Sequence, residues 1–290
     1  MAGELIAAPW QMQWGGLLIG TGTPYSIQKL HGWLDLPGLD MGTTAKPTRP
    51  GSWGARPRPQ SRVVTLELEV RAGVDRMDEV VSALRAATPR SLTADEAPLA
   101  VRLRGETLMA FGKVSNRLIV VDHSFSQALT PAATLQWLCS DPRCYELAER
   151  SVTITPGVSG SGGLVYPLAY PLTYGTAGAS NNATATNIGN DPSSPLLTFT
   201  GPITTPRLVN TTLGYGLEFA VDVLAGQTLV VDTDAGTVLL NGSDRLYTRS
   251  NLSVPVEYFE LYPGDNNLTL LAAAFGTGAS LTVTWKSAYL

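Results

Sequence analysis

The chain has 290 residues, of which 44% are hydrophobic and 15% are charged. This composition excludes a disordered chain, and the length suits two domains of ordinary size. The formal net charge is -4 and is unevenly spread: residues 1–150 contain 16 basic and 15 acidic side chains, and residues 151–290 contain four and nine. Because nucleic-acid-binding domains are usually basic throughout, the charge distribution argues against a dedicated nucleic-acid binder.

The N-terminal stretch, MAGELIAAPWQMQWGGLLIG, has no cationic start, no long apolar run and no clean cleavage site. No other stretch approaches the roughly 20 apolar residues of a membrane-spanning helix. We therefore expect a soluble protein that is made in the cytoplasm.

Residues 10–30 are predicted to form short strands, broken at Gly15–Gly16 and between Gly20 and Pro24. A loop rich in glycine and proline follows over residues 46–62, with five basic residues and no acid. It could contact nucleic acid, a membrane or another protein. Its basic and aromatic side chains are Lys46, Arg49, Trp53, Arg56, Arg58 and Arg62.

Residues 62–72 alternate between apolar and polar side chains, which predicts a half-buried strand. The next stretch predicts a helix, with Asp75 as N-cap and Pro89 beyond its end. Its apolar stripe, expected to face the core, consists of Met77, Val80, Val81 and Leu84.

Strands linked by tight turns are predicted between residues 99 and 140, so the first half is mostly β with one helix. Its two cysteines, Cys139 and Cys144, are separated by four residues. They could be two free or buried thiols, a local disulfide, or half of a metal site. A zinc site requires about four ligands, and the sequence has no second cysteine pair.

Near residue 150 charged residues become sparse, while Gly, Ser, Thr and Asn increase. Short strands then recur at the spacing of a β-sandwich, and no helix is predicted. One hairpin turns at Asp234-Ala235-Gly236, and residues 280–285 should place Leu281, Val283 and Trp285 inward. Residues 151–186 are expected to connect or dock, because Tyr166, Tyr170 and Tyr174 recur at four-residue spacing.

No catalytic, cofactor-binding or metal-binding motif is present. The stretch GVSGSGG lacks the spacing of a nucleophile elbow, and GETLMAFGK lacks that of a phosphate-binding loop. The carboxylates Asp232 and Asp234 flank the hairpin turn, where we expect solvated turn residues rather than an acid–base pair.

Three stretches of the second half, NIGNDPSSPLLTFTGPITTPRLVNTT, AGQTLVVDTDAGTVLLNG and LYPGDNNLTLLAAAFGTGASLTVTWKSAYL, follow one another in order. This order resembles the C-terminal domain of distal tail proteins of long, non-contractile-tailed bacteriophages, especially minor tail proteins of actinobacterial phages. The positions that carry the resemblance are Asn187, Gly189, Asn190, Pro195, Gly201, Pro202, Pro206, Asn210, Gly226, Leu229, Asp232, Thr233, Val238, Asn241, Gly242, Leu261, Pro263, Gly264, Asn266 and Trp285. The first half follows the family order more loosely and has the typical residues Asp141, Pro142, Arg143 and Tyr145.

The resemblance implies a structural virion protein without catalysis or cofactors. Residues 1–150 would be a β-rich, ring-forming domain of tail-tube type, and residues 151–290 a galectin-like β-sandwich. Six copies would form a ring at the distal tail tip that joins the tail tube to the hub or baseplate and lets DNA pass. The implied partners are other copies, the major tail protein, the tail hub or tail-associated protein, the tape measure protein, and receptor-binding proteins or host glycans.

Two alternatives to the ring protein are a carbohydrate-binding module that adheres to the host surface and a tail-associated hydrolase. The likeness to galectins concerns fold, since the second half contains no histidine and Trp285 is expected in the core. Within a ring, the basic loop could pack against an adjacent subunit or the tube, stay solvated, or meet DNA in the pore. We favour the protein interface, because arginine pairs with carboxylates and stacks on aromatic rings.

Overall fold

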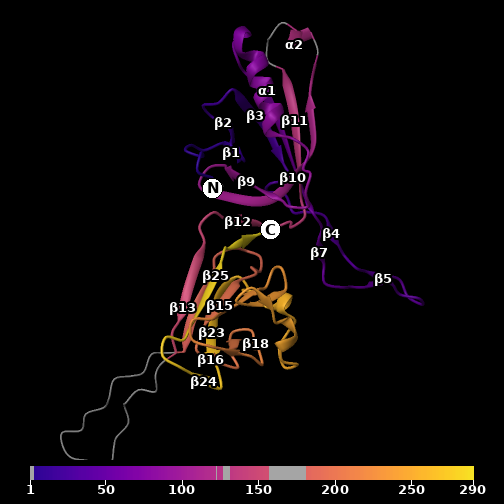
Figure 1. The fold of residues 1–290 in the computed structure, drawn as a ribbon. Coiled ribbons are helices and arrows are strands. Elements are labelled where there is room, and N and C mark those ends of the chain that lie inside the picture. The colour runs from indigo at the N-terminus through magenta and orange to yellow at the C-terminus, as the bar shows by residue number, and fades with distance from the viewer. Residues whose placement is uncertain (1–2, 122, 127–130, 157–180) are drawn as a thin grey trace, which may run out of the picture. The chain divides into compact units, whose positions relative to one another are not determined.

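The computed structural model describes residues 3–121, 123–126, 131–156 and 181–290 (Figure 1). The chain divides into two compact units. Unit 1 comprises Met1–Leu147 with Tyr289–Leu290, and unit 2 comprises Ala148–Ala288. Both are built mainly from β-strands, which confirms the predicted mainly β fold class.

Unit 1 is organised around a nine-stranded antiparallel sheet. Its hydrogen-bonded order is β2 (Leu17–Gly20), β1 (Gln11–Trp14), β9 (Ala97–Arg102), β10 (Thr107–Ile119), β11 (Ala132–Cys139), β8 (Arg62–Val70) and β3 (Tyr25–His31). In addition β12 (Cys144–Glu146) pairs with β10, and β26 (Ala288–Tyr289) pairs with β12. The strands predicted between residues 10 and 30 are confirmed as β1, β2 and β3.

The long strand β10 belongs to both halves of this sheet. Its residues 107–112 pair with β9, and its residues 113–119 pair with β11, with an irregularity between Val114 and Asn116. The two halves contribute to one apolar core, in which the rings of Trp14 and Trp137 have centroids 5.8 Å apart. Strand β8 presents alternate residues to that core, as its sequence predicts; they are Val64, Leu66, Leu68 and Val70.

Helix α1 (Met77–Ala87) packs its predicted apolar stripe into the same core, since Met77, Val80, Val81 and Leu84 are buried. The hydroxyl of Tyr25 donates a 2.8 Å hydrogen bond to the Val80 carbonyl oxygen. The prediction that Asp75 caps the helix was wrong. A 3-10 turn, Val74–Arg76, precedes α1, and neither start carries a side-chain cap.

The C-terminal end of α1 is stabilised by a side chain from outside the helix. Arg117, on β10, donates to the carbonyl oxygens of Arg85 and Thr88 at 2.9 and 2.7 Å. A cation at a helix C-terminus also interacts favourably with the helix dipole. A second helix, α2 (His123–Ser126), is a single turn.

Unit 2 is a β-sandwich. A six-stranded sheet has the order β13 (Arg150–Ile154), β25 (Ser280–Trp285), β15 (Leu196–Thr200), β20 (Thr228–Asp232), β21 (Thr237–Leu240) and β22 (Ser243–Asp244). A four-stranded sheet has the order β14 (Asn182–Asn187), β23 (Gly264–Leu271), β17 (Arg207–Asn210) and β18 (Tyr215–Glu218). Three short strands, β19 (Asp222–Val223), β16 (Ile203–Thr204) and β24 (Ala274–Phe275), form a third sheet.

The core of the sandwich is filled by alternate residues from both larger sheets. Leu281, Val283 and Trp285 of β25 are buried, as predicted, and Phe199 meets Phe219 edge-on at a centroid distance of 6.3 Å. The predicted hairpin is β20–β21, with Asp232 paired to Thr237 across the turn. Within the described part of unit 2, the helical elements are the 3-10 turns η2 (Leu246–Thr248) and η3 (Val256–Tyr258).

The segment 151–186, expected to connect or dock, begins and ends as sandwich strands. Strand β13 pairs with β25, and β14 pairs with β23. Tyr166, Tyr170 and Tyr174 lie outside the described residues, so their docking stays a prediction.

Buried asparagines hold the loops of unit 2 to its strands. Asn266 is 1% exposed; its Nδ2 donates to the carbonyl oxygens of Tyr262 and Gly264 at 2.7 and 3.2 Å. Its Oδ1 accepts from Asn210 Nδ2 at 3.0 Å and from the Tyr262 backbone N–H at 3.2 Å. The side-chain amide thus satisfies the buried amide of Asn210 and ties the Tyr262–Gly264 loop to its strand.

Replacing Asn266→Ala should lower the free energy of unfolding by about 1–3 kcal/mol, because the truncation removes the acceptor of the buried Asn210 Nδ2 and the bonds to the Tyr262–Gly264 loop. Urea unfolding measures this loss. Asn251→Ala is the matched control, since Asn251 is exposed and its substitution should change stability by less than about 0.5 kcal/mol. Equal stability of the two variants would contradict the assigned role.

Candidate functional site: a basic arm and its anchor

The predicted basic loop forms the outer part of an arm, residues 34–61, that extends from unit 1 (Figure 1). Two short antiparallel pairs run along it: β4 (Leu39–Asp40) with β7 (Arg58–Pro59), and β5 (Thr44–Ala45) with β6 (Ser52–Trp53). None of the arm's residues is buried. A two-stranded ribbon without a core of its own is marginally stable in water, so this arm depends on its anchor or on a partner.

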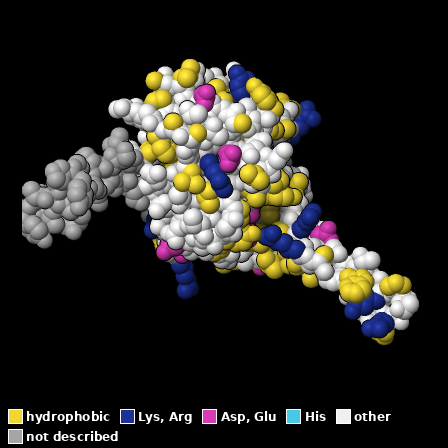
Figure 2. Space-filling model, turned by 90° about the horizontal axis from the view of Figure 1, so that it is seen from below, with side chains coloured by type: hydrophobic (Ala, Val, Ile, Leu, Met, Phe, Trp, Pro, Cys, Tyr) yellow, Lys and Arg dark blue, Asp and Glu magenta, His cyan; other side chains and the backbone are white. Residues whose placement is uncertain are grey.

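The arm exposes large apolar side chains beside its cations. Those exposed by at least half are Leu34, Leu36, Met41 and Trp53, and the cations are Lys46, Arg49, Arg56 and Arg58. Its acids are Asp35 and Asp40, both before the turn at the tip. Figure 2 shows apolar and basic side chains side by side at the end of the arm. This mixture of Trp, Met and Arg is typical of protein–protein interfaces.

The tip is ordered by two local contacts. The Nζ of Lys46 lies 5.1 Å from the centroid of the Trp53 ring, a cation–π geometry. The backbone N–H of Lys46 donates to the Gly51 carbonyl oxygen at 3.0 Å. Trp53 nevertheless keeps 64% of its surface exposed. The ring is therefore held in place and still available to a partner.

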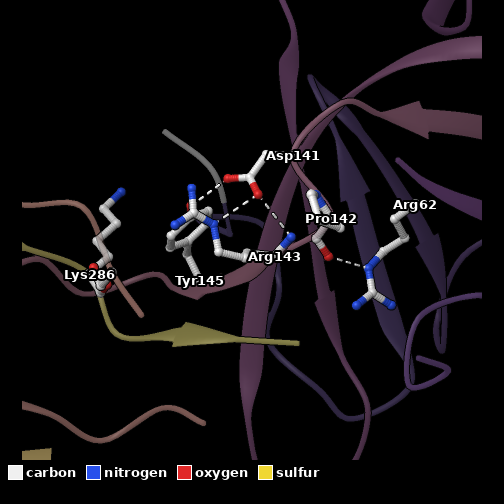
Figure 3. Close-up of polar contacts among 7 residues, drawn as sticks. Arg62, Asp141, Pro142, Arg143, Tyr145 and Lys286 are labelled. Atoms are coloured by element: carbon white, nitrogen blue, oxygen red, sulfur yellow. Dashed lines mark hydrogen bonds and ion pairs between the residues drawn. The ribbon is translucent and has the colours of Figure 1, made fainter. Parts of the chain in front are cut away.

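Arg62 anchors the base of the arm. It is only 3% exposed, and its Nε donates to the Pro142 carbonyl oxygen at 2.6 Å (Figure 3). One terminal nitrogen donates to the carbonyl oxygens of Gly32, Trp33 and Asp35 at 2.7, 3.0 and 2.9 Å. One guanidinium thus joins the entry of the arm, its exit at β8, and the turn after β11.

The buried position of Arg62 corrects the prediction that this residue belongs with the exposed residues of the loop. The other five candidates, Lys46, Arg49, Trp53, Arg56 and Arg58, lie on the arm. Arg62 lies in the core and cannot offer its guanidinium to a partner. The sequence does indicate that Arg62 is buried, because side chains alternate along a strand and position 62 falls on the same face of β8 as the buried apolar residues.

The turn that receives Arg62 is stabilised by Asp141. One carboxylate oxygen accepts from the backbone N–H and the Nε of Arg143 at 3.1 and 2.9 Å, and the other accepts from the Tyr145 hydroxyl (Figure 3). The Arg143 guanidinium also lies 5.6 Å from the Tyr145 ring centroid. These contacts hold the Pro142 carbonyl oxygen towards Arg62. They give the sequence DPRCY a structural role.

Cys139 and Cys144 are both free and buried, which corresponds to the first of the three alternatives that their spacing leaves open. Burial raises the pKa of Cys139 to about 12 and that of Cys144 to about 11, although the nearby Arg62 charge lowers both. Thiols that stay protonated at neutral pH are poor nucleophiles and poor metal ligands. We assign both to the core.

In unit 2, the residues behind the family resemblance serve the chain's turns. Asp232 Oδ1 accepts from the backbone N–H groups of Asp234 and Ala235 at 2.9 and 3.0 Å, so it is a turn residue as predicted. A Cβ on Gly189 would lie 1.8 Å from the Ala288 carbonyl oxygen, which leaves room only for glycine. These positions of the family resemblance thus reflect folding constraints rather than catalytic chemistry.

Among the residues that the structure describes, no three His, Cys, Asp or Glu side chains are grouped so that they could hold a metal ion. Trp285 is only 6% exposed, and its Nε1 donates to the Thr186 carbonyl oxygen at 3.2 Å, so it is no stacking platform for a sugar. Within the described ranges, no helix combines the length and apolar character needed to cross a bilayer.

Replacing Arg62→Met should destabilise unit 1 by about 3 kcal/mol, because four carbonyl oxygens lose a charged donor. Proteolysis should also cut the base of the arm sooner. Arg62→Lys should recover little of this, since an ammonium lacks the planar fork. Urea unfolding and limited proteolysis measure both effects, with the exposed Arg58→Met as control. Wild-type stability of Arg62→Met would refute the anchor.

The buried thiols predict a loss of stability in alkali. Both pKa values are raised in the folded protein, so their stabilising contribution is complete below the ordinary thiol pKa of 9.0 and decreases as the pH rises towards 11–12. Urea unfolding across this interval should show a smaller loss for the Cys139→Ala/Cys144→Ala variant than for the wild type. Both proteins keep Tyr25 and Tyr215, whose pKa values burial also raises. The difference between the two pH profiles therefore excludes the contribution of these tyrosines to stability. If the stabilities of the two proteins fall in parallel as the pH rises, the buried thiols do not cause the loss.

Comparison with known proteins shows what the chain resembles in sequence and in fold. Residues 188–289 match the family "Siphovirus-type tail component, C-terminal domain". No curated protein sequence matches the chain. Among solved structures, the Dit protein (gp 19.1) of phage SPP1, described as a paradigm of the hub adsorption apparatus in phages infecting Gram-positive bacteria, is 14% identical. The match covers 97% of this chain and 99% of that one, with a TM-score of 0.64.

A chain in the activated baseplate of phage P2 is 9% identical over 94% of this chain and 97% of its own, but its TM-score of 0.48 is too low to support an argument. Residues 188–289 are therefore similar to the C-terminal domain of siphovirus-type tail components, and the chain shares the fold of SPP1 Dit, which confirms the resemblance to distal tail proteins.

Proposed function

We propose that the chain is a structural virion protein of a phage tail tip. Six copies form a ring at the distal end of the tail, which joins the tail tube to the hub or baseplate and lets DNA pass during ejection. The observation that carries this proposal is the match of both units in one chain to SPP1 Dit, combined with the family match of residues 188–289. The protein is made in the host cytoplasm and then built into the tail.

The raised pKa values of Cys139, Cys144, Tyr25 and Tyr215 fit a role without catalysis, because burial is the largest cause of each shift. A general acid or base would need a shifted group within an accessible site. These four groups are instead core thiols and phenols.

We propose that the arm is the contact between adjacent copies or between the ring and the tube. Its prolines, Pro47, Pro50, Pro57 and Pro59, lower the conformational entropy lost when it docks. Its exposed Trp53 and arginines can be buried against a neighbour, where planar guanidinium groups pair with carboxylates. The -5 charge of residues 151–290 and the acids of other tail proteins offer such carboxylates.

A role for the arm in holding DNA fits less well. Cations that bind phosphates in the pore would retain the passing DNA, since each neutralised phosphate adds salt-dependent affinity. The apolar residues Leu34, Leu36 and Met41 beside the cations also suit a protein surface better than a phosphate track. The remaining partners we propose are the major tail protein, the hub or tail-associated protein, the tape measure protein and receptor-binding proteins.

The ring predicts the mass of the purified protein. Six copies of the 30.7 kDa chain have a combined mass of about 184 kDa, and negative-stain images should show a ring with a central hole. Light scattering measures the mass. A monomer at every concentration, also in the presence of tail tubes, would contradict the proposal.

The arm predicts a charge-specific assembly defect. Arg56→Ala/Arg58→Ala should weaken ring formation about tenfold or more, because interface arginines often carry a large share of the binding energy. The matched control is Arg90→Ala/Arg104→Ala, which removes two exposed charges of unit 1 outside the arm. Concentration-dependent light scattering compares them. If rings form equally well in both variants, the arm is not the interface.

A further inference from the structure

Unit 2 has a surface cleft that the ring does not explain. It is an open cleft of about 640 Å³ between β22, η2 and η3. The side chains at its wall that the argument uses are Asp244, Tyr247, Arg249, Asn251 and Glu257. A volume of this size lies within the range of small-molecule sites.

Tyr247 supplies an aromatic surface at this cleft. It is 77% exposed, and the Arg245 guanidinium lies 5.9 Å from its ring centroid. The cation–π contact steadies a side chain that would otherwise rotate freely. An exposed, oriented phenol ring offers its apolar face to a ligand together with a polar edge.

Three polar side chains beside it are available for hydrogen bonds. Asn251 and Glu257 are exposed and make no side-chain hydrogen bond within the described part of the chain. Asp244 uses one oxygen, which accepts from the Leu246 backbone N–H at 2.9 Å. Glu257 is confined by the β20–β21 turn, because a Cβ on Gly236 would lie 2.4 Å from its carboxylate.

The cleft is formed before any ligand arrives. The loop that carries Tyr247 is bonded to the end of β18: Ala220 N–H donates to the Thr248 carbonyl oxygen, and Ser250 N–H donates to the Glu218 carbonyl oxygen, both at 2.8 Å. Arg249 donates to the carbonyl oxygens of Ser253 and Val254 at 2.9 and 3.3 Å. Little conformational entropy would be lost on binding.

We propose that this cleft binds a neutral saccharide. A pyranose presents an apolar C–H face, which stacks on Tyr247, and hydroxyl groups, which donate to Asp244, Asn251 and Glu257. Two cations lie beside the two carboxylates, but Arg249 is bonded to backbone carbonyl oxygens and Arg245 lies against the Tyr247 ring. The carboxylates and the net charge of -5 over residues 151–290 therefore disfavour an anionic sugar. The site goes beyond the proposed ring and does not depend on it.

Saturation-transfer NMR on the full-length protein tests the proposal with cellobiose, maltose, lactose and N,N'-diacetylchitobiose, and with glucuronate as the anionic control. We expect transfer to the ring protons of at least one neutral disaccharide, with a dissociation constant in the millimolar range. Tyr247→Ala should weaken that affinity about tenfold or more. Tyr258→Ala is the matched control, because Tyr258 is 68% exposed but does not line the cleft.

Three outcomes would overturn the saccharide site: no transfer to any neutral disaccharide, equal affinity of glucuronate, or unchanged affinity in Tyr247→Ala. A loss of equal size in Tyr258→Ala would also overturn it, because it would place the contact on the wider exposed surface. The mass of Tyr247→Ala measured by light scattering should equal that of the wild type. A failure of the saccharide site and a failure of the ring are therefore distinguishable.

Discussion

The buried guanidinium of Arg62 is the interaction on which the arm depends. A charged side chain in a protein core is costly unless its donors are satisfied, and here four carbonyl oxygens satisfy them. Three of these carbonyl groups belong to residues 32–35, where the chain enters the arm, and the fourth belongs to the Asp141–Arg143 turn. The arm itself buries no residue, so its direction is set at its base. A surface that is exposed along its length but fixed at one end suits assembly with neighbours.

Unit 2 follows a different principle, in which loops are tied to a sandwich by buried amides. Asn187, Asn210 and Asn266 bond to backbone groups within turns, and Gly189 permits the close approach of another strand. These are the positions that make the second half recognisable from its sequence. The family resemblance therefore reflects folding constraints, which explains why it is visible in a sequence without a catalytic motif.

The sequence predicted the strands and α1 well, because their apolar residues recur with a clear period. It missed the start of α1, since Asp75 lies in a 3-10 turn whose bonding a local pattern does not reveal. It also missed the role of Arg62, although the parity of β8 places that residue inward. The cleft at Tyr247 could not have been predicted, because residues 244–257 become one wall only through their bonds to Glu218 and Ala220. Such a site depends on tertiary pairing that no spacing in the sequence encodes.

In the proposed assembly, the arm is covered when copies join. Hydrogen–deuterium exchange of residues 34–61, compared between the dissociated protein and the assembled ring or tail, tests this most directly. Few of the arm's amides are bonded in the ribbon, so they should exchange quickly in the free protein and become protected on assembly, while the β8 core stays protected in both. Equal exchange of the arm in the free and assembled states would contradict the account.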